Sequence, residues 1–492
     1  MPITLAGWWM LKIWSGTRIA LGWLVLASLV FYAAWDPRYL AVLLSSVFIN
    51  FWLGGRILAA KARQAERQAG HWMTAGVGFN LLVLGGFKYA YFLASNLFAV
   101  FSLPPPFEPV LLPLAISFVT FQKIAYLVDC RRGIVARHDP LDYLFFVSFF
   151  PQLIAGPIVH HRPLIAQTVP GENPLFRQPD AIVAGLAFFA IGLFKKVVLA
   201  DSMARYASPV FELARQGVPG GEAAWQAMLA YTLQLYFDFS GYSDMAIGLA
   251  LMFGFRLPIN FSSPYQAASI IDFWRRWHIT LSSFLRDYLY IPLGGNRHGV
   301  IARYRNLWLT MLLAGLWHGA GWNFLLWGAL HGSMLLLNHA WRGALARLRM
   351  VAAIWQRIPA AFSIGLTFFL VALAWVLFRS ADLATASHLY QALIHPLAGD
   401  RLAPIPWRSA GDLLEVLTGT MPEAGWLWVV IGLLIVMFTP NSARLLSYDP
   451  TPNMPYAIKL RFSLGILVGA CLWFGLKWMA VRPATEFLYF NF

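Results

Sequence analysis

His318 is the side chain in this sequence best placed for acid–base chemistry. It ends an apolar run that starts at Leu307, and it is followed thirteen residues later by His331. An ionisable group at membrane depth is costly and marks a functional site by default, and the unperturbed pKa of histidine lies near neutrality. We therefore expect His318 to act as a general base that deprotonates a hydroxyl as it attacks an acyl group, which is worth about 10²–10⁴-fold in rate. A buried histidine satisfied by a backbone carbonyl is the alternative.

His278 closes a second notable stretch, in which Trp274, Arg275, Arg276 and Trp277 precede it. On a helix the two tryptophans and His278 would share one face, and the arginines would project elsewhere. The histidine would then face a pocket while the arginines meet anionic groups. Contact of the arginines with lipid headgroups is the alternative. The same two interpretations apply to three further cations: Lys123, Arg286 and Arg297.

Asp238 and Asp244 lie in an otherwise apolar segment, 223–250. Unpaired carboxylates there would cost several kcal/mol, so we expect a structural network with arginines of residues 275–286. A paired-carboxylate hydrolase is the alternative. Asn323, just after the His318 motif, is a candidate hydrogen-bond donor for a developing oxyanion.

Familiar hydrolytic and nucleotide-binding motifs are absent from the sequence. Gly294 and Gly295 predict a tight turn, but no Walker-type Lys-Ser/Thr ending follows them. The sequence contains neither a GxSxG nor an HExxH motif, and the histidine spacing does not predict a zinc site. The only cysteines, Cys130 and Cys471, predict neither a disulfide framework nor a metal site.

The composition indicates a polytopic membrane protein. Of the 492 residues, 59% are hydrophobic and only 12% are charged, whereas soluble domains carry about 25% charged residues. The net charge of +15 is explained by basic cytoplasmic loops, so no nucleic-acid partner is expected. We predict one integral domain over residues 1–492.

Eleven apolar segments are long enough to be candidate membrane spans. They are residues 18–35, 39–57, 73–95, 109–128, 181–200, 223–250, 305–317, 322–340, 361–378, 426–439 and 463–481. Residues 141–159 are broken by prolines and are expected to be re-entrant, and residues 257–304 are expected to form interfacial helices. Residues 253–305 hold seven Arg against two Asp, and 341–360 hold four Arg. The positive-inside rule therefore places both loops in the cytoplasm and residues 379–425 outside.

Six ordered motifs resemble those of the membrane-bound O-acyltransferase family, in the bacterial branch represented by the membrane subunit of alginate O-acetyltransferase. They are Pro113–Phe121, Phe149–Pro157, Tyr236–Asp244, Phe273–His278, Arg286–Arg297 and Leu316–Ala320. The resemblance is strongest over a motif core at residues 111–340. It implies an all-α bundle of about 11 transmembrane helices around a central tunnel. It also implies an essential histidine at His318 and a second characteristic histidine at His278.

The resemblance implies an O-acyltransferase of the bacterial inner membrane that takes acetyl from cytosolic acetyl-CoA and binds no cofactor. Arg275, Arg276, Arg286 and Arg297 would contact the donor phosphates. The acceptor would be an exopolysaccharide such as alginate or cellulose, reached through a periplasmic acetyltransferase- or esterase-like partner. Two other functions stay open: D-alanyl transfer from a carrier-protein thioester to a cell-wall polymer, and a polysaccharide exporter or secondary transporter.

Overall fold

The structure is a computed structural model of the chain. It describes all residues except 136, 155, 170–178, 349–356, 396–424, 452–461, 482–486 and 489–492. Every regular element within the described residues is helical, in agreement with the predicted all-α class. Most of the loop predicted to lie outside the cytoplasm, residues 379–425, falls in the segment 396–424 and is therefore outside the described residues.

The predicted spans lie almost entirely on helical residues of the structure, except that residues 109–115 of the span 109–128 are not helical and the helix there begins at Ile116. Five helical segments are long and apolar enough to cross a membrane: Pro37–Ala62, Glu66–Val100, Asp180–Leu213, Ala360–Arg379 and Phe462–Val481. Two shorter apolar helices, Thr17–Ala33 and Gly425–Phe438, match further predicted spans. These helices support a polytopic membrane protein, and the total of eleven spans stays a prediction.

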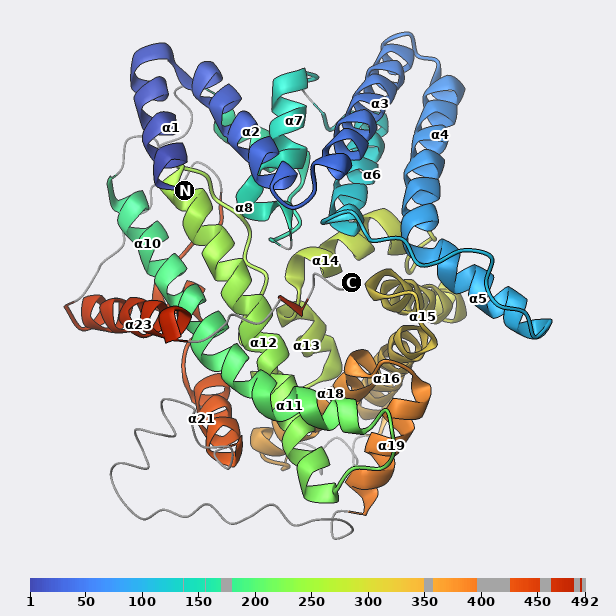
Figure 1. The fold of residues 1–492 in the computed structure, drawn as a ribbon. Helices are drawn as coiled ribbons and strands as arrows, with labels where there is room; N and C mark the ends of the chain where they lie inside the picture. Colours follow the sequence, from blue (N-terminus) through green and yellow to red (C-terminus); the bar gives the residue numbers. More distant parts are fainter. Residues whose placement is uncertain are drawn as a thin grey trace. The chain divides into compact units, whose positions relative to one another are not determined.

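The chain forms two compact units, and it passes between them more than once. The first unit comprises Met1–Phe189, Ser243–Ile259 and Leu446–Arg461. Its helices are α1 (Pro2–Ser15), α2 (Thr17–Ala33), α3 (Pro37–Ala62), α4 (Glu66–Leu84), α5 (Ala90–Val100), α6 (Ile116–Arg132), α7 (Pro140–Ser148), α8 (Phe150–Leu153), α9 (His161–Ile165) and most of α10 (Pro179–Leu193). Helices α3, α4 and α6 pack side by side (Figure 1). The predicted re-entrant segment 141–159 is indeed broken, into α7 and α8.

The second unit comprises Ala190–Tyr242, Asn260–Leu445 and Phe462–Phe492. It contains α11 (Asp201–Leu213), most of α12 (Gly221–Met252), α13 (Ile270–Arg276), α14 (Ile279–Leu285), α15 (Gly299–His318), α16 (Trp322–Arg347), α18 (Ala360–Arg379), α19 (Leu383–Ile394), α21 (Gly425–Phe438), α22 (Ser442–Leu445) and α23 (Phe462–Val481). The predicted interfacial stretch 257–304 holds the short helices α13 and α14, as expected. Both histidine motifs lie in this unit.

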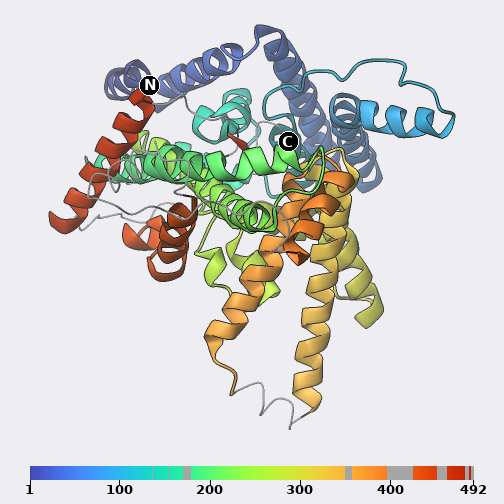
Figure 2. The same ribbon diagram turned by 60° about the horizontal axis from the view of Figure 1, so that its bottom comes forward.

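Helices α15 and α16 form a tightly packed hairpin, and α18 runs beside α16 (Figure 2). Glycines allow this approach: a Cβ added at Gly315 of α15 would lie 2.2 Å from the Phe324 carbonyl oxygen of α16. A Cβ added at Gly328 of α16 would lie 2.5 Å from the Met311 carbonyl oxygen of α15. Small residues permit such close backbone contact between membrane helices. The hairpin therefore holds the C-terminal end of α15, with His318, against the first turns of α16.

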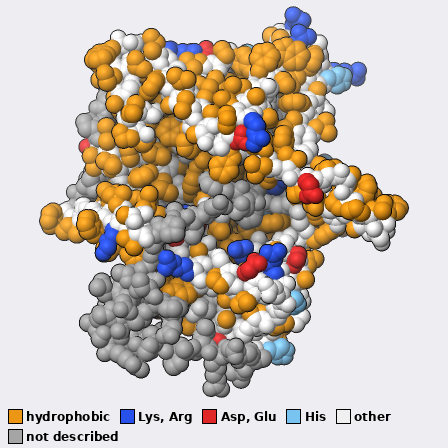
Figure 3. All heavy atoms as spheres, viewed as in Figure 1, with side chains coloured by type: hydrophobic (Ala, Val, Ile, Leu, Met, Phe, Trp, Pro, Cys, Tyr) orange, Lys and Arg blue, Asp and Glu red, His pale blue; other side chains and the backbone are white. Residues whose placement is uncertain are grey.

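Large apolar side chains cover much of the surface seen in Figure 3. Ile301, Phe438 and Phe462 are each at least 80% exposed, which would be unfavourable in water. Soluble proteins seldom expose apolar patches beyond a few hundred Å². The exposed apolar side chains, together with the five helical segments of spanning length, identify a membrane protein.

The side of the membrane on which each loop lies can be tested with introduced cysteines. Arg297→Cys lies in the basic loop before α15, and Ala381→Cys lies in the exposed turn after α18. Three helices separate them, α15, α16 and α18, so we expect an impermeant maleimide to label the two positions only from opposite sides. The native Cys130 and Cys471 are buried and should give little background. Labelling of both positions from one side would contradict the predicted topology.

Candidate active site

His318 is the last residue of α15 and is only 3% exposed. The helix ends there, as the sequence predicts, and the chain turns through residues 319–321 into α16. The imidazole lies among aromatic rings. Its centroid is 5.2 Å from that of Trp327, with the rings at 89°, and 5.1 Å from that of Phe378. Aromatic edges and faces thus surround the candidate base and keep bulk water from it.

His331 lies one turn after Trp327 on α16, and its ring centroid is 4.7 Å from that tryptophan. It is fully buried. Its Nδ1 accepts a hydrogen bond from Trp274 Nε1 at 3.3 Å. Because an indole N–H can only donate, Nδ1 carries the lone pair, and the proton of the neutral imidazole is on Nε2. Within the described residues Nε2 has no hydrogen-bond partner, so His331 presents an unused N–H donor.

Trp327 therefore lies between two imidazoles, and α18 completes their surroundings. Trp375 stacks on Trp327 at 5.6 Å and 20°, and Phe378 contacts His318. Asn323 fixes this arrangement because its Nδ2 donates to the carbonyl oxygens of Leu377 at 3.3 Å and Ser380 at 2.8 Å. The amide nitrogen of Asn323 is thus engaged in joining α16 to the end of α18, and His331 is the better-placed candidate for an oxyanion donor.

His278 is 1% exposed and lies in a neighbouring cluster, with its ring 4.7 Å from that of Phe239. Its Nδ1 is 3.1 Å from Asn260 Oδ1, which also accepts the backbone N–H of Thr280 at 3.3 Å. A backbone N–H can only donate, so this Asn260 atom is an oxygen and His278 Nδ1 is the donor. Nε2 of neutral His278 therefore carries the lone pair. Burial lowers the pKa of His278 to about 3, which keeps the ring neutral.

The predicted helical face of Trp274, Trp277 and His278 is wrong. Helix α13 ends at Arg276, Trp277 is extended, and His278 has φ +44°, in the left-handed region. The cause is the neighbouring loop 253–263, which contains Asn260. The backbone oxygen of Asn260 accepts the Ile279 N–H at 3.0 Å, and this tertiary hydrogen bond turns the chain between α13 and α14.

The four arginines predicted to bind the donor do not share one environment. Arg276 bonds Asp272 at 3.0 Å and Arg286 bonds the adjacent Asp287 at 2.7 Å. Arg275 and Arg297 are exposed, and neither has a carboxylate partner within the described residues. Their charges are therefore the two most available to an anion.

Asp238 is buried, but its partner differs from the prediction. Lys196 Nζ bonds Asp238 Oδ1 at 2.7 Å and Asp201 Oδ1 at 2.8 Å, and the Leu488 N–H donates to Asp238 Oδ2 at 3.0 Å. The expected network with arginines of residues 275–286 is thus wrong for Asp238, because Lys196 supplies its cationic partner while Arg276 and Arg286 bond Asp272 and Asp287. Asp244 is also buried, two turns later on α12. These contacts give Asp238 a structural role.

The sequence profile of the membrane-bound O-acyltransferase family matches residues 71–378. This match includes all the histidines and arginines described above. The chain belongs to the membrane-bound O-acyltransferase family. It is therefore an O-acyltransferase, and a transporter or exporter is not supported.

Three relatives show what kinds of protein in the family this chain is similar to. The chain is 37% identical to a peptidoglycan O-acetyltransferase of Helicobacter pylori, over 100% of this chain and 95% of that protein. It is 45% identical to a protein of Pseudomonas aeruginosa named “Probable alginate O-acetylase”, over 77% of this chain and 70% of that protein. Similarity to a teichoic acid D-alanyltransferase of Streptococcus thermophilus is lower, 28% over 46% of this chain and 57% of that protein.

His331 is the residue that the sequence-based site prediction omitted. Its distance from His318 along the chain gave no reason to pair them. The available signal was the i, i+4 spacing of Trp327 and His331, which places both on one face of α16. Together the residues offer a base, His318, and a hydrogen-bond donor, His331, in a shared aromatic environment.

We expect loss of the His331 donor to slow acyl transfer without unfolding the protein. His331→Phe keeps an aromatic ring but removes Nε2–H, and kcat should fall by about 10²–10³-fold, as for removal of an oxyanion donor, with little change in KM. Trp274→Phe, which removes only the N–H that selects the tautomer, should cause a smaller loss. Initial rates and thermal unfolding of the three proteins provide the measurement. A wild-type kcat in His331→Phe would contradict this role.

Proposed function

We propose that this O-acyltransferase moves acetyl from cytosolic acetyl-CoA toward the hydroxyl of a polysaccharide outside the cytoplasm, and that it acts in the bacterial inner membrane. The observation that supports this most directly is His318, buried at the end of α15 in an aromatic cluster inside the family-matched region. Water that reached this site would hydrolyse the thioester. Burial of His318 among rings therefore suits transfer over hydrolysis.

In the proposed step, His318 accepts the proton of the acceptor hydroxyl while the hydroxyl oxygen attacks the thioester carbonyl carbon. A carbon–oxygen bond forms and negative charge develops on the carbonyl oxygen, to which His331 Nε2–H donates a hydrogen bond. The carbon–sulfur bond then breaks. The leaving thiolate takes the proton back from the imidazolium of His318. The products are an acetyl ester and free CoA thiol.

The donor assignment rests on the uncompensated arginines. CoA carries several phosphate charges, and arginine contacts phosphate through a planar pair of N–H groups that lysine lacks. Arg275 lies two residues before the Trp277–His278 turn, and both Arg275 and Arg297 are exposed. They lie in the segment that the positive-inside rule assigns to the cytoplasm, where acetyl-CoA would be available.

The acceptor assignment rests on the relatives. Their names specify O-acetylation of peptidoglycan and of alginate, and both polymers carry sugar hydroxyls. We propose an acceptor of this chemical class, an exopolysaccharide such as alginate or cellulose, acetylated with the help of a periplasmic acetyltransferase- or esterase-like protein. Transfer of D-alanyl is the weaker candidate, because the D-alanyltransferase match is lower in identity and covers less of the chain.

The role of His318 is tested by substitution. His318→Ala should remain membrane-inserted but release no CoA from acetyl-CoA in the presence of acceptor and add no acetyl to the polymer, because the proton acceptor is gone. His298→Ala, at an exposed histidine on the same unit, is the matched control and should be active. Substantial acetylation by His318→Ala would refute the catalytic role.

The role of Arg275 is tested by donor titration. Arg275→Gln should raise the KM for acetyl-CoA by roughly 10–150-fold, from the loss of a charge-assisted hydrogen bond worth about 1.5–3 kcal/mol. Arg286→Gln should have less effect, because Asp287 already neutralises that guanidinium. High salt should reproduce part of the Arg275→Gln effect in the wild type. An unchanged KM with altered detergent stability would instead indicate a lipid anchor.

A further inference from the structure

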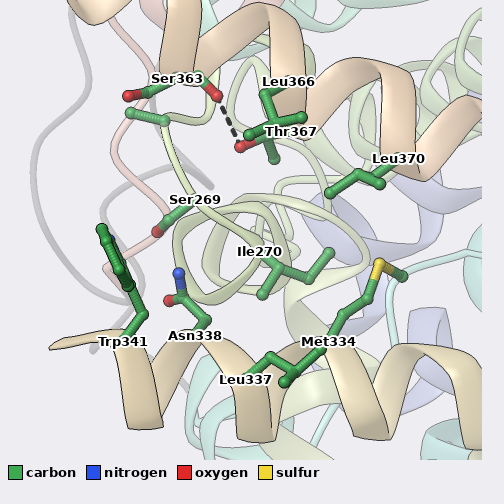
Figure 4. Close-up of a pocket in the computed structure, with 11 residues that line it drawn as sticks. Ser269, Ile270, Met334, Leu337, Asn338, Trp341, Ser363, Leu366, Thr367 and Leu370 are labelled. Carbon is green, nitrogen blue, oxygen red and sulfur yellow. Dashed lines mark hydrogen bonds between the residues drawn. The ribbon is translucent and has the colours of Figure 1, made fainter. Parts of the chain in front are cut away.

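A cavity of about 320 Å³ lies at the start of α13, between α16 and α18 (Figure 4). Its size is at the lower end of the range of small-molecule sites, about 300–1,000 Å³. None of the 11 residues that line it is a histidine. The lining therefore includes neither of the histidines that the proposed acetyl transfer uses.

One end of the cavity is apolar and open to the surface. Met334 and Leu337 of α16 face Leu366 and Leu370 of α18 across it (Figure 4). Leu337, Leu366 and Leu370 are 69%, 42% and 39% exposed. Because α18 is one of the helices of spanning length, this opening meets the acyl chains of the bilayer. A hydrocarbon chain could enter without crossing a polar barrier.

The other end of the cavity has polar lining residues, Ser269 and Asn338, and Arg342 borders it. Arg342, one residue after the lining residue Trp341, donates to Ser269 Oγ at 3.3 Å. The lining residue Asn338 has a buried Oδ1 with no hydrogen-bond partner within the described residues. None of the described residues that line the cavity is acidic. An occupant that suits both ends needs an apolar chain, an anionic group at Arg342 and a hydrogen-bond donor at Asn338.

We propose that this cavity binds one molecule of an anionic glycerophospholipid with a hydroxylated headgroup, such as phosphatidylglycerol. One acyl chain lies between α16 and α18, the phosphate contacts Arg342, and a headgroup hydroxyl donates to Asn338. Basic pockets between membrane helices on the cytoplasmic side are known to take anionic lipid headgroups, and Arg342 opens the basic loop assigned to that side. The bound lipid would join α16 to α18, the two helices that enclose His318.

The test is lipid binding by the full-length protein in detergent, followed by native mass spectrometry and by thermal unfolding. Phosphatidylglycerol, phosphatidylcholine and inorganic phosphate are the three probes. The wild type should retain one phosphatidylglycerol and unfold at a higher temperature with it, as expected for a ligand of the native state. Phosphatidylcholine should bind at least about tenfold more weakly, and inorganic phosphate should not stabilise the protein.

Two variants and their matched controls locate the site. Arg342→Gln should weaken phosphatidylglycerol binding by about tenfold or more, and Met334→Trp, which fills the apolar end, should abolish it. Arg347→Gln and Leu326→Trp change exposed residues of the same helix that do not line the cavity, and both should bind like the wild type. Each protein must show the same helical content for the comparison to count.

Four results would overturn the proposal: equal lipid retention by all variants, equal binding of phosphatidylcholine, equal stabilisation by inorganic phosphate, or displacement of the lipid by acetyl-CoA. The last would make the cavity part of the donor site. Lipid binding is measured without enzymatic turnover. Its outcome therefore does not depend on whether the acetyl-transfer proposal is correct.

Discussion

The close approach of α15 and α16 is the constraint on which the candidate active site depends. Gly315 and Gly328 lie where the two backbones touch, and any Cβ there would meet a carbonyl of the other helix. Lipid chains are as apolar as leucine side chains, so membrane helices associate through such close packing instead of through the hydrophobic effect. A wider hairpin would separate His318 at the end of α15 from Trp327 on α16, and with it the shared environment of His318 and His331.

Burial of imidazoles among tryptophans has a cost that the surrounding hydrogen bonds partly offset. The buried His331 and His278 are satisfied in opposite ways. Trp274 donates to Nδ1 of His331, so Nε2 of His331 carries the proton. Asn260 accepts from Nδ1 of His278, so Nε2 of His278 carries the lone pair. Trp274 and Asn260 therefore each select one tautomer of the histidine that they contact. This selection distinguishes a hydrogen-bond donor from an acceptor in two chemically identical side chains.

The charges divide into those neutralised inside the protein and those left for ligands. Lys196 holds Asp238 and Asp201 in a buried network, and loss of one partner would leave an uncompensated buried charge. Arg275, Arg297 and Arg342 lie at the surface. Both proposed ligands of these arginines, a CoA phosphate and a lipid phosphate, are anionic. The lipid phosphate and the CoA phosphate would compete if they bound the same arginines. They would not compete if Arg342 binds only the lipid at the cavity and Arg275 and Arg297 bind only the donor.

The sequence by itself determined the helical class and the end of α15 at His318, because these depend on local hydropathy and on one helix break. It also carried the family motifs. Only the tertiary structure decided which groups meet. The turn at Trp277–His278 depends on hydrogen bonds that Asn260 accepts, and the partner of Asp238 is Lys196, on another helix. Likewise, His331 joins His318 only through packing around Trp327. Helix periodicity is a local property, whereas hydrogen-bond and ring partners depend on how distant helices pack.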